Sequence, residues 1–174
     1  HCRQCGTPVQ YRIPDDGDTR ERAVCPACGT IHYVNPLLVV GTVPYLGDQV
    51  LLCQRAIEPR RGKWTLPAGF MEMDETLAQG TARETAEEAG ARIEMGAFYS
   101  AMSIPRIGQV HVFYLARLLS AHFDPGPESA QARLFTEDQI PWDELAFTAV
   151  RRTLECFFED RRRGGFGVHD FDIA

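Results

Sequence analysis

Two apolar runs in the first third of the chain have the composition of β-strands. Leu37 to Leu46 reads LLVVGTVPYL and Gln49 to Arg55 reads QVLLCQR, and both are rich in aliphatic residues. Gly47 and Asp48, which separate the two runs, are typical of a tight turn. The pattern therefore predicts a β-hairpin.

Three later segments also have strand character: Ile93 to Ser103, Gln109 to Leu119 and Ala132 to Phe135. In the second of them, His111 alternates with valines and shares an apolar face with Phe113. A histidine in this position is more typical of a core residue than of a ligand.

Two segments have the periodicity of helices. The first is Thr76 to Ala89, with Asp74 or Glu75 at its N-terminus and Gly90 as a left-handed stop. The second is Trp142 to Arg163, in one or two pieces. Its expected inward-facing residues are Ala146, Val150, Leu154 and Phe157 or Phe158.

The first helix carries small residues opposite its acids, which predicts close packing of that stripe against a sheet. Gly80 lies on the acidic face, where glycine costs about 1 kcal/mol relative to alanine. It either clears space for a ligand or is simply tolerated. The small residues are Ala78, Ala82, Thr85 and Ala89.

The elements after residue 34 run strands, helix, strands, helix. This order predicts an α/β (α+β) sandwich on a mixed sheet. The last segment, Gly164 to Ala174, is glycine-rich and acidic. We expect it either to be loose or to fold back across a surface.

Four cysteines form two C-x2-C pairs, Cys2 with Cys5 and Cys25 with Cys28. This spacing predicts a structural Zn²⁺ site, because four thiolates leave no open position for catalysis. Disulfides or redox thiols are the alternative. We expect a zinc-ribbon subdomain over residues 1–34 and a second domain over residues 35–174.

A cluster of acids lies in the first helix. Glu84, Glu87 and Glu88 are three and four residues apart, so a helix places them on one face. Arg83 is the only nearby cation on that helix. Hard divalent cations prefer oxygen ligands, so the cluster predicts a metal site.

Acidic residues outnumber basic ones 24 to 18, and the net charge is −6. This balance argues against a nucleic-acid partner that binds broadly and non-specifically, because such binding needs a basic surface. A nucleotide substrate stays possible because metal ions can offset its charge. No apolar run reaches the ~18 residues of a membrane helix, and no signal peptide is visible. We therefore expect no membrane partner and a cytoplasmic location.

Residues 69–90 read GFMEMDETLAQGTARETAEEAG. They resemble the Nudix box, G-x5-E-x7-R-E-U-x-E-E-x-G-U, in which U is a bulky aliphatic residue. The fixed positions all match, whereas Thr85 and Ala91 stand at the two U positions. The resemblance implies the Nudix fold, an α/β/α sandwich on a mixed sheet. It also implies hydrolysis of a nucleoside diphosphate linked to another moiety.

The resemblance implies roles for individual residues as well. Arg83 cannot act as a base, since its pKa exceeds about 12, and it is expected to bridge to Glu75. Glu84 is the leading catalytic and metal-binding residue. Catalytic Mg²⁺ (or Mn²⁺) is expected on the carbonyl of Gly69 and the carboxylates of Glu84, Glu87 and Glu88.

The general base is either a glutamate of the box or an acid of a later loop. Relatives often carry an acid near the start of the strand at residue 132, where Ala130 and Gln131 offer none. Glu128 is the nearest acid, and neighbouring Pro and Gly residues shape its loop. We therefore predict a catalytic or metal role for Glu128, with a solvated loop acid as the alternative.

A zinc ribbon before a Nudix box resembles the arrangement of NADH pyrophosphatases. Their S-Q-P-W-P-F-P-x-S motif is missing at residues 103–109. The stretches IHYVNP, LPAGFME and ESAQARLF resemble zinc-ribbon Nudix proteins related to plant FAD and ADP-ribose pyrophosphatases. The predicted reaction is Mg-dependent hydrolysis of FAD, ADP-ribose or a related dinucleotide, releasing AMP. Trp64 and Arg106 are predicted to bind this substrate.

Two other functions stay open. One is a nucleoside-triphosphate or capped-RNA pyrophosphohydrolase, and the other is a nucleotide-binding regulator without catalysis. The intact acids argue against the regulator. Because Nudix pyrophosphatases of this type often pair, a homodimer is a further expectation.

Overall fold

The computed structural model describes all 174 residues. They form two compact units, His1–Pro36 and Leu37–Ala174, and each is described by itself. None of the helices combines the length and the apolar character that crossing a membrane requires.

The first unit is a small antiparallel sheet in the order β1-β2-β3. The chain reverses after each cysteine pair at a glycine with positive φ, Gly6 at 76° and Gly29 at 74°. Such backbone suits glycine, which has no side chain to clash. Polar residues connect the first two strands. The strands are β1 (Gln10–Arg12), β2 (Arg22–Val24) and β3 (Ile31–His32).

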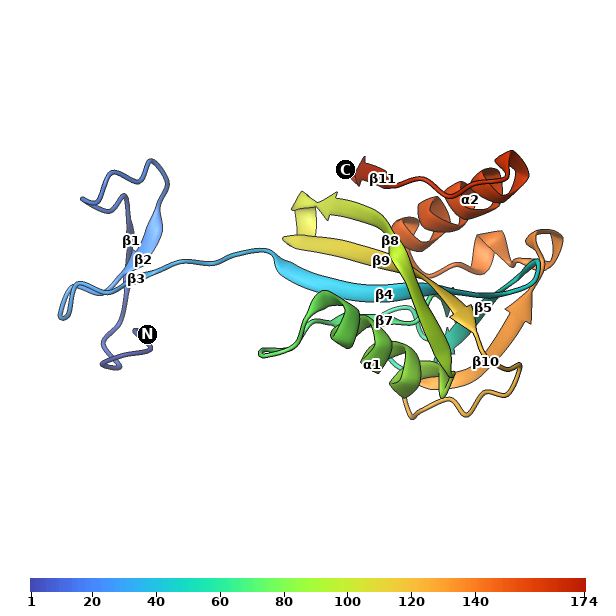
Figure 1. The fold of residues 1–174 in the computed structure, drawn as a ribbon. Coiled ribbons are helices and arrows are strands. Elements are labelled where there is room, and N and C mark those ends of the chain that lie inside the picture. The colour runs from blue at the N-terminus through green and yellow to red at the C-terminus, as the bar shows by residue number, and fades with distance from the viewer. The chain divides into compact units, whose positions relative to one another are not determined.

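The second unit is built on a mixed sheet in the order β10-β5-β4-β9-β8-β11, with β6 paired to β5 and β7 paired to β4 (Figure 1). The pairs β4–β9 and β8–β11 are parallel and the others are antiparallel. The predicted hairpin is confirmed as β4 and β5. The strands are β4 (Leu37–Leu46), β5 (Gln49–Arg55), β6 (Trp64–Thr65), β7 (Ala68–Phe70), β8 (Ile93–Ile104), β9 (Gln109–Leu118), β10 (Ser129–Phe135) and β11 (His169–Asp172).

Two helices cover opposite faces of this sheet (Figure 1). They are α1 (Leu77–Ala89) and α2 (Thr148–Arg163). The arrangement is the expected α/β/α sandwich. Three short 3-10 turns join the longer elements: Pro105–Ile107, Glu137–Gln139 and Trp142–Glu144.

The larger hydrophobic core includes the apolar stripe of α2 and residues of the sheet. The inward positions predicted for this helix are confirmed, and both candidate phenylalanines are buried. The predicted helix from Trp142 is two pieces, because the short 3-10 turn ends before α2 begins. The buried residues are Ala146, Val150, Leu154, Phe157 and Phe158.

Helix α1 begins one residue later than Thr76, which is its N-cap. The hydroxyl of Thr76 accepts from the N–H of Gln79, and the Gln79 side chain accepts from the N–H of Thr76. This reciprocal box replaces the expected role of Asp74 or Glu75. Gly90 ends the helix in the left-handed region, at φ 59°, as predicted.

The predicted burial of small residues on α1 is confirmed for Thr85 and Ala89, but their predicted separation from the acids is wrong. Glu84 and Glu88 lie on the buried side of the helix together with Thr85, whereas Ala78 is exposed. A polar contact lies at the centre of this packing. The hydroxyls of Thr42 and Thr85 lie 2.7 Å apart between the sheet and the helix.

Candidate active site

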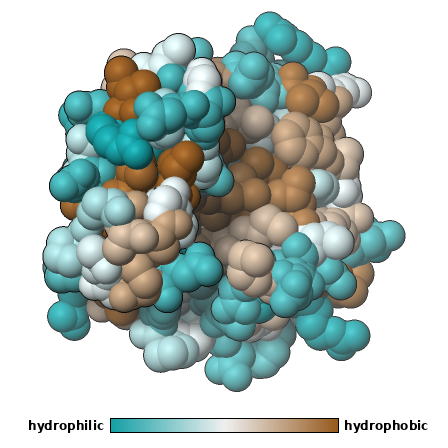
Figure 2. All heavy atoms as spheres, turned by 90° about the vertical axis from the view of Figure 1, so that its left-hand side faces the viewer, coloured by the Kyte–Doolittle hydropathy of each residue, from teal (hydrophilic) through white to brown (hydrophobic).

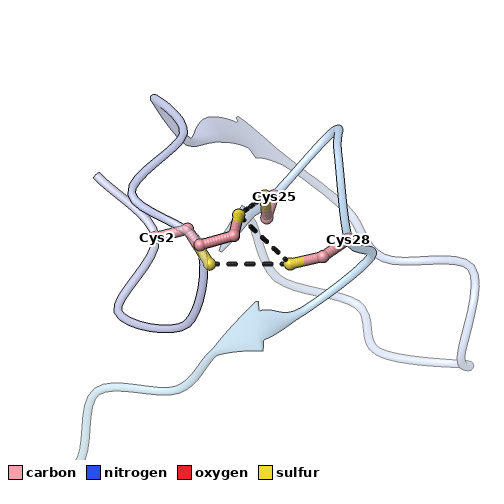
Figure 3. Close-up of side chains that lie close together, drawn as sticks. Cys2, Cys25 and Cys28 are labelled. Atoms are coloured by element: carbon pink, nitrogen blue, oxygen red, sulfur yellow. Dashed lines mark hydrogen bonds between the residues drawn. The ribbon is translucent and has the colours of Figure 1, made fainter.

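The four cysteines of the first unit form one cluster. Their sulfurs all lie within 4.8 Å of one another. The Sγ–Sγ distance is 3.6 Å between Cys2 and Cys28 and between Cys5 and Cys28 (Figure 3). It is 3.5 Å between Cys5 and Cys25. Tetrahedral bonds of about 2.3 Å to zinc would separate the sulfurs by about 3.8 Å. The cluster therefore fits a closed, structural Zn²⁺ site.

In the second unit, Gly69, the first fixed position of the box, lies directly against Glu84. Gly69 is on β7, which pairs with β4 at Val40, and Glu84 projects from α1 toward it. A Cβ atom added to Gly69 would lie 2.5 Å from the carboxyl carbon of Glu84. Only glycine lets this carboxylate approach the β7 backbone so closely.

Glu88 lies one turn further along α1 and is more deeply buried than Glu84. Its Oε2 accepts a hydrogen bond from the N–H of Ala68 at 3.0 Å, and the residue is 7% exposed. Burial raises the pKa of Glu88 to about 7. Burial likewise raises the pKa of Glu84, although Arg83 opposes it. Buried carboxylates of this kind are stabilised by a cation, so the donor set fits a hard divalent metal.

Arg83 ties the acids of the box together. Its Nε and Nη2 donate to the two oxygens of Glu75 at 3.0 and 2.8 Å. Its Nη1 donates to Glu84 at 2.6 Å and to Glu87 at 3.0 Å, and Nη2 also reaches the carbonyl of Phe70. The hydrogen bonds from Arg83 lower the pKa of Glu75 to about 2.

The acids are thus better neutralised than their spacing suggested, because Arg83 contacts three of them. The predicted bridge between Arg83 and Glu75 is present as a bidentate pair. The single positive charge of Arg83 cannot neutralise Glu75, Glu84, Glu87 and Glu88 together. A bound cation would neutralise part of the remaining negative charge.

The presence of glycine at position 80 has an explanation other than the two that the sequence suggested. A Cβ atom added there would lie 2.5 Å from Oε1 of Glu75 and 3.1 Å from Cγ2 of Val40. Gly80 therefore makes room for the Glu75 carboxylate, and through it for the position of Arg83.

The loop after β9 docks on the C-terminal end of α1. The N–H of Asp124 donates to the carbonyl of Ala89, and the N–H of Gly126 donates to that of Glu87, both at 3.1 Å. A Cβ atom on Gly126 would overlap the Glu87 carbonyl. This docking brings Glu128 to the cavity that holds the box acids.

The cavity that contains the acids has a volume of about 780 Å³. A second cavity of about 510 Å³ adjoins it. Figure 2 shows one face of the molecule with apolar surface in a central hollow and hydrophilic residues around it. Five residues line both cavities: Arg55, Pro59, Ala68, Gly69 and Phe70.

The two residues predicted to bind substrate have different positions. Arg106 lines the second cavity. Trp64 does not line either cavity; it is 9% exposed and packs edge-to-face on Phe135 with 4.8 Å between ring centroids. Trp64 is therefore a core residue, and its predicted substrate contact is corrected. His111 also lines the second cavity, and burial lowers its pKa.

Arg55 is a site residue that sequence reasoning missed. Its Nε donates to the carbonyl of Pro59 at 2.7 Å, and its guanidinium lies 5.3 Å from the ring centroid of Phe147. It lines both cavities. Its position as the last residue of a predicted strand, just before a loop, was the available signal.

Comparison with known proteins identifies the family. The model of the NUDIX domain matches residues 36–155, which is more than half of the chain. This chain belongs to the Nudix family. Residues 1–34 match the model of the Nudix N-terminal zinc ribbon, so the ribbon expected from the cysteine spacing is confirmed as a family feature.

Solved structures agree with this assignment. A NUDIX hydrolase from Nitrosomonas europaea is 51% identical, with a TM-score of 0.95 over 99% of this chain and 97% of that one. An ADP-ribose pyrophosphatase from Streptococcus suis is 26% identical, with a TM-score of 0.64 over 79% of this chain and 100% of that one.

Among curated proteins, an NAD-capped RNA hydrolase NudC from Deinococcus radiodurans is 32% identical over 94% of this chain and 58% of its own length. The chain thus spans little more than half the length of the first curated relatives that it matches.

Proposed function

We propose that this protein hydrolyses the diphosphate bond of a nucleoside diphosphate linked to another moiety, with divalent-metal dependence. The proposed substrates are FAD, ADP-ribose or a related dinucleotide, and AMP is a product. The observation that carries the proposal is the pair of adjoining cavities. One holds the acids of the box, and the other offers space for a group joined to the diphosphate.

The box residues would hold Mg²⁺ or Mn²⁺ through the carboxylates of Glu84, Glu87 and Glu88 and the carbonyl of Gly69. The metal when bound neutralises phosphate charge and acidifies water. Arg83 and Glu75 act as positioning residues, since their bidentate pair fixes the direction of the hydrogen bond from Arg83 to Glu84.

Glu128 is our proposed general base. It lines the same cavity as Glu84 and Glu88, and its charge contributes to the raised pKa of both. A base must lie within hydrogen-bond reach of the water from which it takes a proton. The loop that carries Glu128 is hydrogen-bonded to the end of α1, and Glu128 lines the cavity that also holds the acids of that helix, which supports this role.

Arg55 and Arg106 are our proposed substrate-binding residues. Arg55 lines both cavities and Arg106 lines the second. A guanidinium pairs readily with phosphate oxygens and stacks on aromatic rings. Arg55 stands where the diphosphate would pass from one cavity into the other.

Zinc is proposed as a structural ion in the ribbon, where four thiolates form a closed set. A nucleotide-derived small molecule is the proposed partner, and a homodimer and a cytoplasmic location stay predictions.

A capped RNA is the second candidate substrate. Two curated relatives at 32% identity are named NAD-capped RNA hydrolases. Such a substrate also contains a diphosphate bond, so the same acids would serve. The missing motif at residues 103–109 is the reason that we place the dinucleotides first.

The test is a substrate panel with Mg²⁺ or Mn²⁺: FAD, ADP-ribose, NADH, NAD-capped RNA and nucleoside triphosphates, with product identification. AMP from FAD or ADP-ribose supports the proposal. Cleavage of capped RNA alone would shift it to the second candidate. No turnover of any member, with binding retained, would favour a regulator.

A matched pair of variants ties the activity to the acids. Glu84→Gln should lower kcat by at least about 100-fold and weaken Mn²⁺ binding, since loss of even an outer partner of a metal site costs 10–100-fold. Glu94→Gln changes an exposed acid that pairs with Arg117, and it should leave kcat and Mn²⁺ binding unchanged. Equal activity of Glu84→Gln and the parent would refute the metal assignment.

A further inference from the structure

The segment after α2 crosses the molecule as a strap, which we define as Gly164–Ala174. It folds back rather than being loose, and β11 within it runs parallel to β8 at the edge of the sheet (Figure 1). The N–H of Gly164 caps α2 by donating to the carbonyls of Asp160 and Arg161. The strap thus starts from a fixed point.

A buried carboxylate holds the strap. Asp160 of α2 is 4% exposed, and one of its oxygens accepts from three groups. These are His169 at 2.7 Å, the N–H of Gly167 at 3.1 Å and the hydroxyl of Tyr99 at 3.2 Å. Two of the three donors belong to the strap, so Asp160 is its main polar anchor.

Aromatic packing completes the attachment. Phe166 stacks on Phe157 with 5.3 Å between ring centroids, and His169 lies edge-on to Tyr99 at 5.0 Å. His169 and Phe171 alternate with exposed aspartates, so the inner face of β11 carries two aromatic rings. Both Phe171 and Ile173 pack against the larger hydrophobic core.

The end of the strap reaches the candidate substrate space. The N–H of Ile173 donates to the carbonyl of Ser103 at 2.9 Å, which continues the pairing of β11 with β8. Ile173 and Ala174 line the second cavity, together with Arg106 and Phe147. A segment that is distant in sequence from the box therefore forms one wall of the second cavity, which adjoins the cavity of the box acids.

We propose that the strap is a specificity element, in which Ile173 forms an apolar wall against the group joined to the diphosphate, and Asp160 with His169 sets the position of that wall. The inference rests on the proposed function, because the group meant is the non-reacting part of the same substrate. Its chemical class is a moiety with an apolar or ring surface.

The wall acts on binding more than on chemistry. Ile173 does not line the cavity that contains the acids, so it does not touch the reacting phosphates. A lost apolar contact in a pocket lowers affinity by roughly 10-fold or more for each methylene. A residue that contacts only the remote group changes KM and leaves kcat nearly unchanged.

The test compares four variants with FAD and ADP-ribose as substrates. Ile173→Ala should raise KM about 10-fold for at least one of them, with kcat within about twofold. Val168 is an exposed residue of the strap outside both cavities, so Val168→Ala should change neither KM nor kcat. His169→Ala should raise KM in the same direction as Ile173→Ala, and His169→Gln, which keeps an N–H donor, should restore most of the loss.

Calorimetric binding of ADP-ribose to the same variants separates this inference from the proposed function. If the parent cleaves these substrates and Ile173→Ala has the parent KM, the wall is refuted while the function stands. If the parent binds ADP-ribose without cleaving it, weaker binding by Ile173→Ala still supports the wall, and equal binding refutes it. If the parent neither cleaves nor binds, both proposals fail.

Discussion

Gly69 of β7 and Glu84 of α1 approach so closely that a side chain on residue 69 would occupy the space of the Glu84 carboxylate. The contact joins a strand to a helix across the loop of residues 71–76. It explains in steric terms why the box begins with glycine, and it sets the distance between a backbone carbonyl and a buried acid.

Gly69→Ala should therefore displace Glu84 and lower kcat by about 100-fold, because a shift of about 1 Å in a catalytic group has an effect of that order. Steady-state kinetics with FAD or ADP-ribose measure it. Gly165→Ala is the control, since a Cβ atom there meets nothing within 4 Å. Parent-like kcat in Gly69→Ala would show that the close approach has no catalytic role.

Arg83→Lys should lower kcat by about 10- to 100-fold although the charge is kept. Lysine cannot reproduce the two parallel hydrogen bonds to Glu75 while also reaching Glu84. Mn²⁺ affinity, measured by calorimetry, should fall as well. Arg117→Lys, at an exposed pair with Glu94, provides the comparison. Similar kinetics for the two variants would contradict the positioning role.

Metal analysis of the purified protein should find about one zinc per chain. Cys5→Ser should lose most of it, because Cys5 contacts both Cys25 and Cys28. Cys156→Ser changes a cysteine outside the cluster and should keep the zinc. Full zinc content in Cys5→Ser, or none in the parent, would remove the proposed ribbon site.

The attachment of the strap should weaken in acid. Burial by itself raises the pKa of Asp160, but hydrogen bonds from His169 of β11, the Gly167 N–H and Tyr99 of β8 outweigh it, so the pKa lies below the ordinary value of 3.8. Cys156 and Glu159 of α2 also face this cluster through Tyr99. A lowered folded-state pKa stabilises the protein above the unfolded-state pKa, and this stabilisation disappears as the pH falls through the folded-state value.

Chemical denaturation of the parent and of Asp160→Asn should therefore differ most in unfolding free energy near neutral pH. The difference should narrow as the pH falls from about 5 to about 3. Asp170→Asn, an exposed position of β11, is the control. A difference between parent and Asp160→Asn that stays constant over this range would contradict the lowered pKa.

The box and the cysteine pairs were predictable because their chemistry depends on short spacings. Residues i, i+3 and i+4 of a helix are neighbours whatever surrounds it, and two C-x2-C turns bring sulfurs together locally. The hairpin of β4 and β5 and the left-handed end of α1 at Gly90 follow from local turn preferences in the same way.

The burial of Glu84 and Glu88 was not predictable from the same spacings. Helical periodicity suggests that small residues pack inward and acids point outward. The packing of α1 follows the contact between Thr42 and Thr85 and the hydrogen bond from Ala68 to Glu88, which join segments distant in the chain.

The sequence by itself determined the family, the order of elements, the acids of the box and the cysteine cluster, because each depends on residues within a turn, a helix or a match to a known pattern. Only the tertiary structure decided that Trp64 is a core residue, that Arg55 lines both cavities and that Ile173 of the strap lines the second one. The physical reason is that strand order and register place remote segments around one cavity, and no local spacing specifies that arrangement.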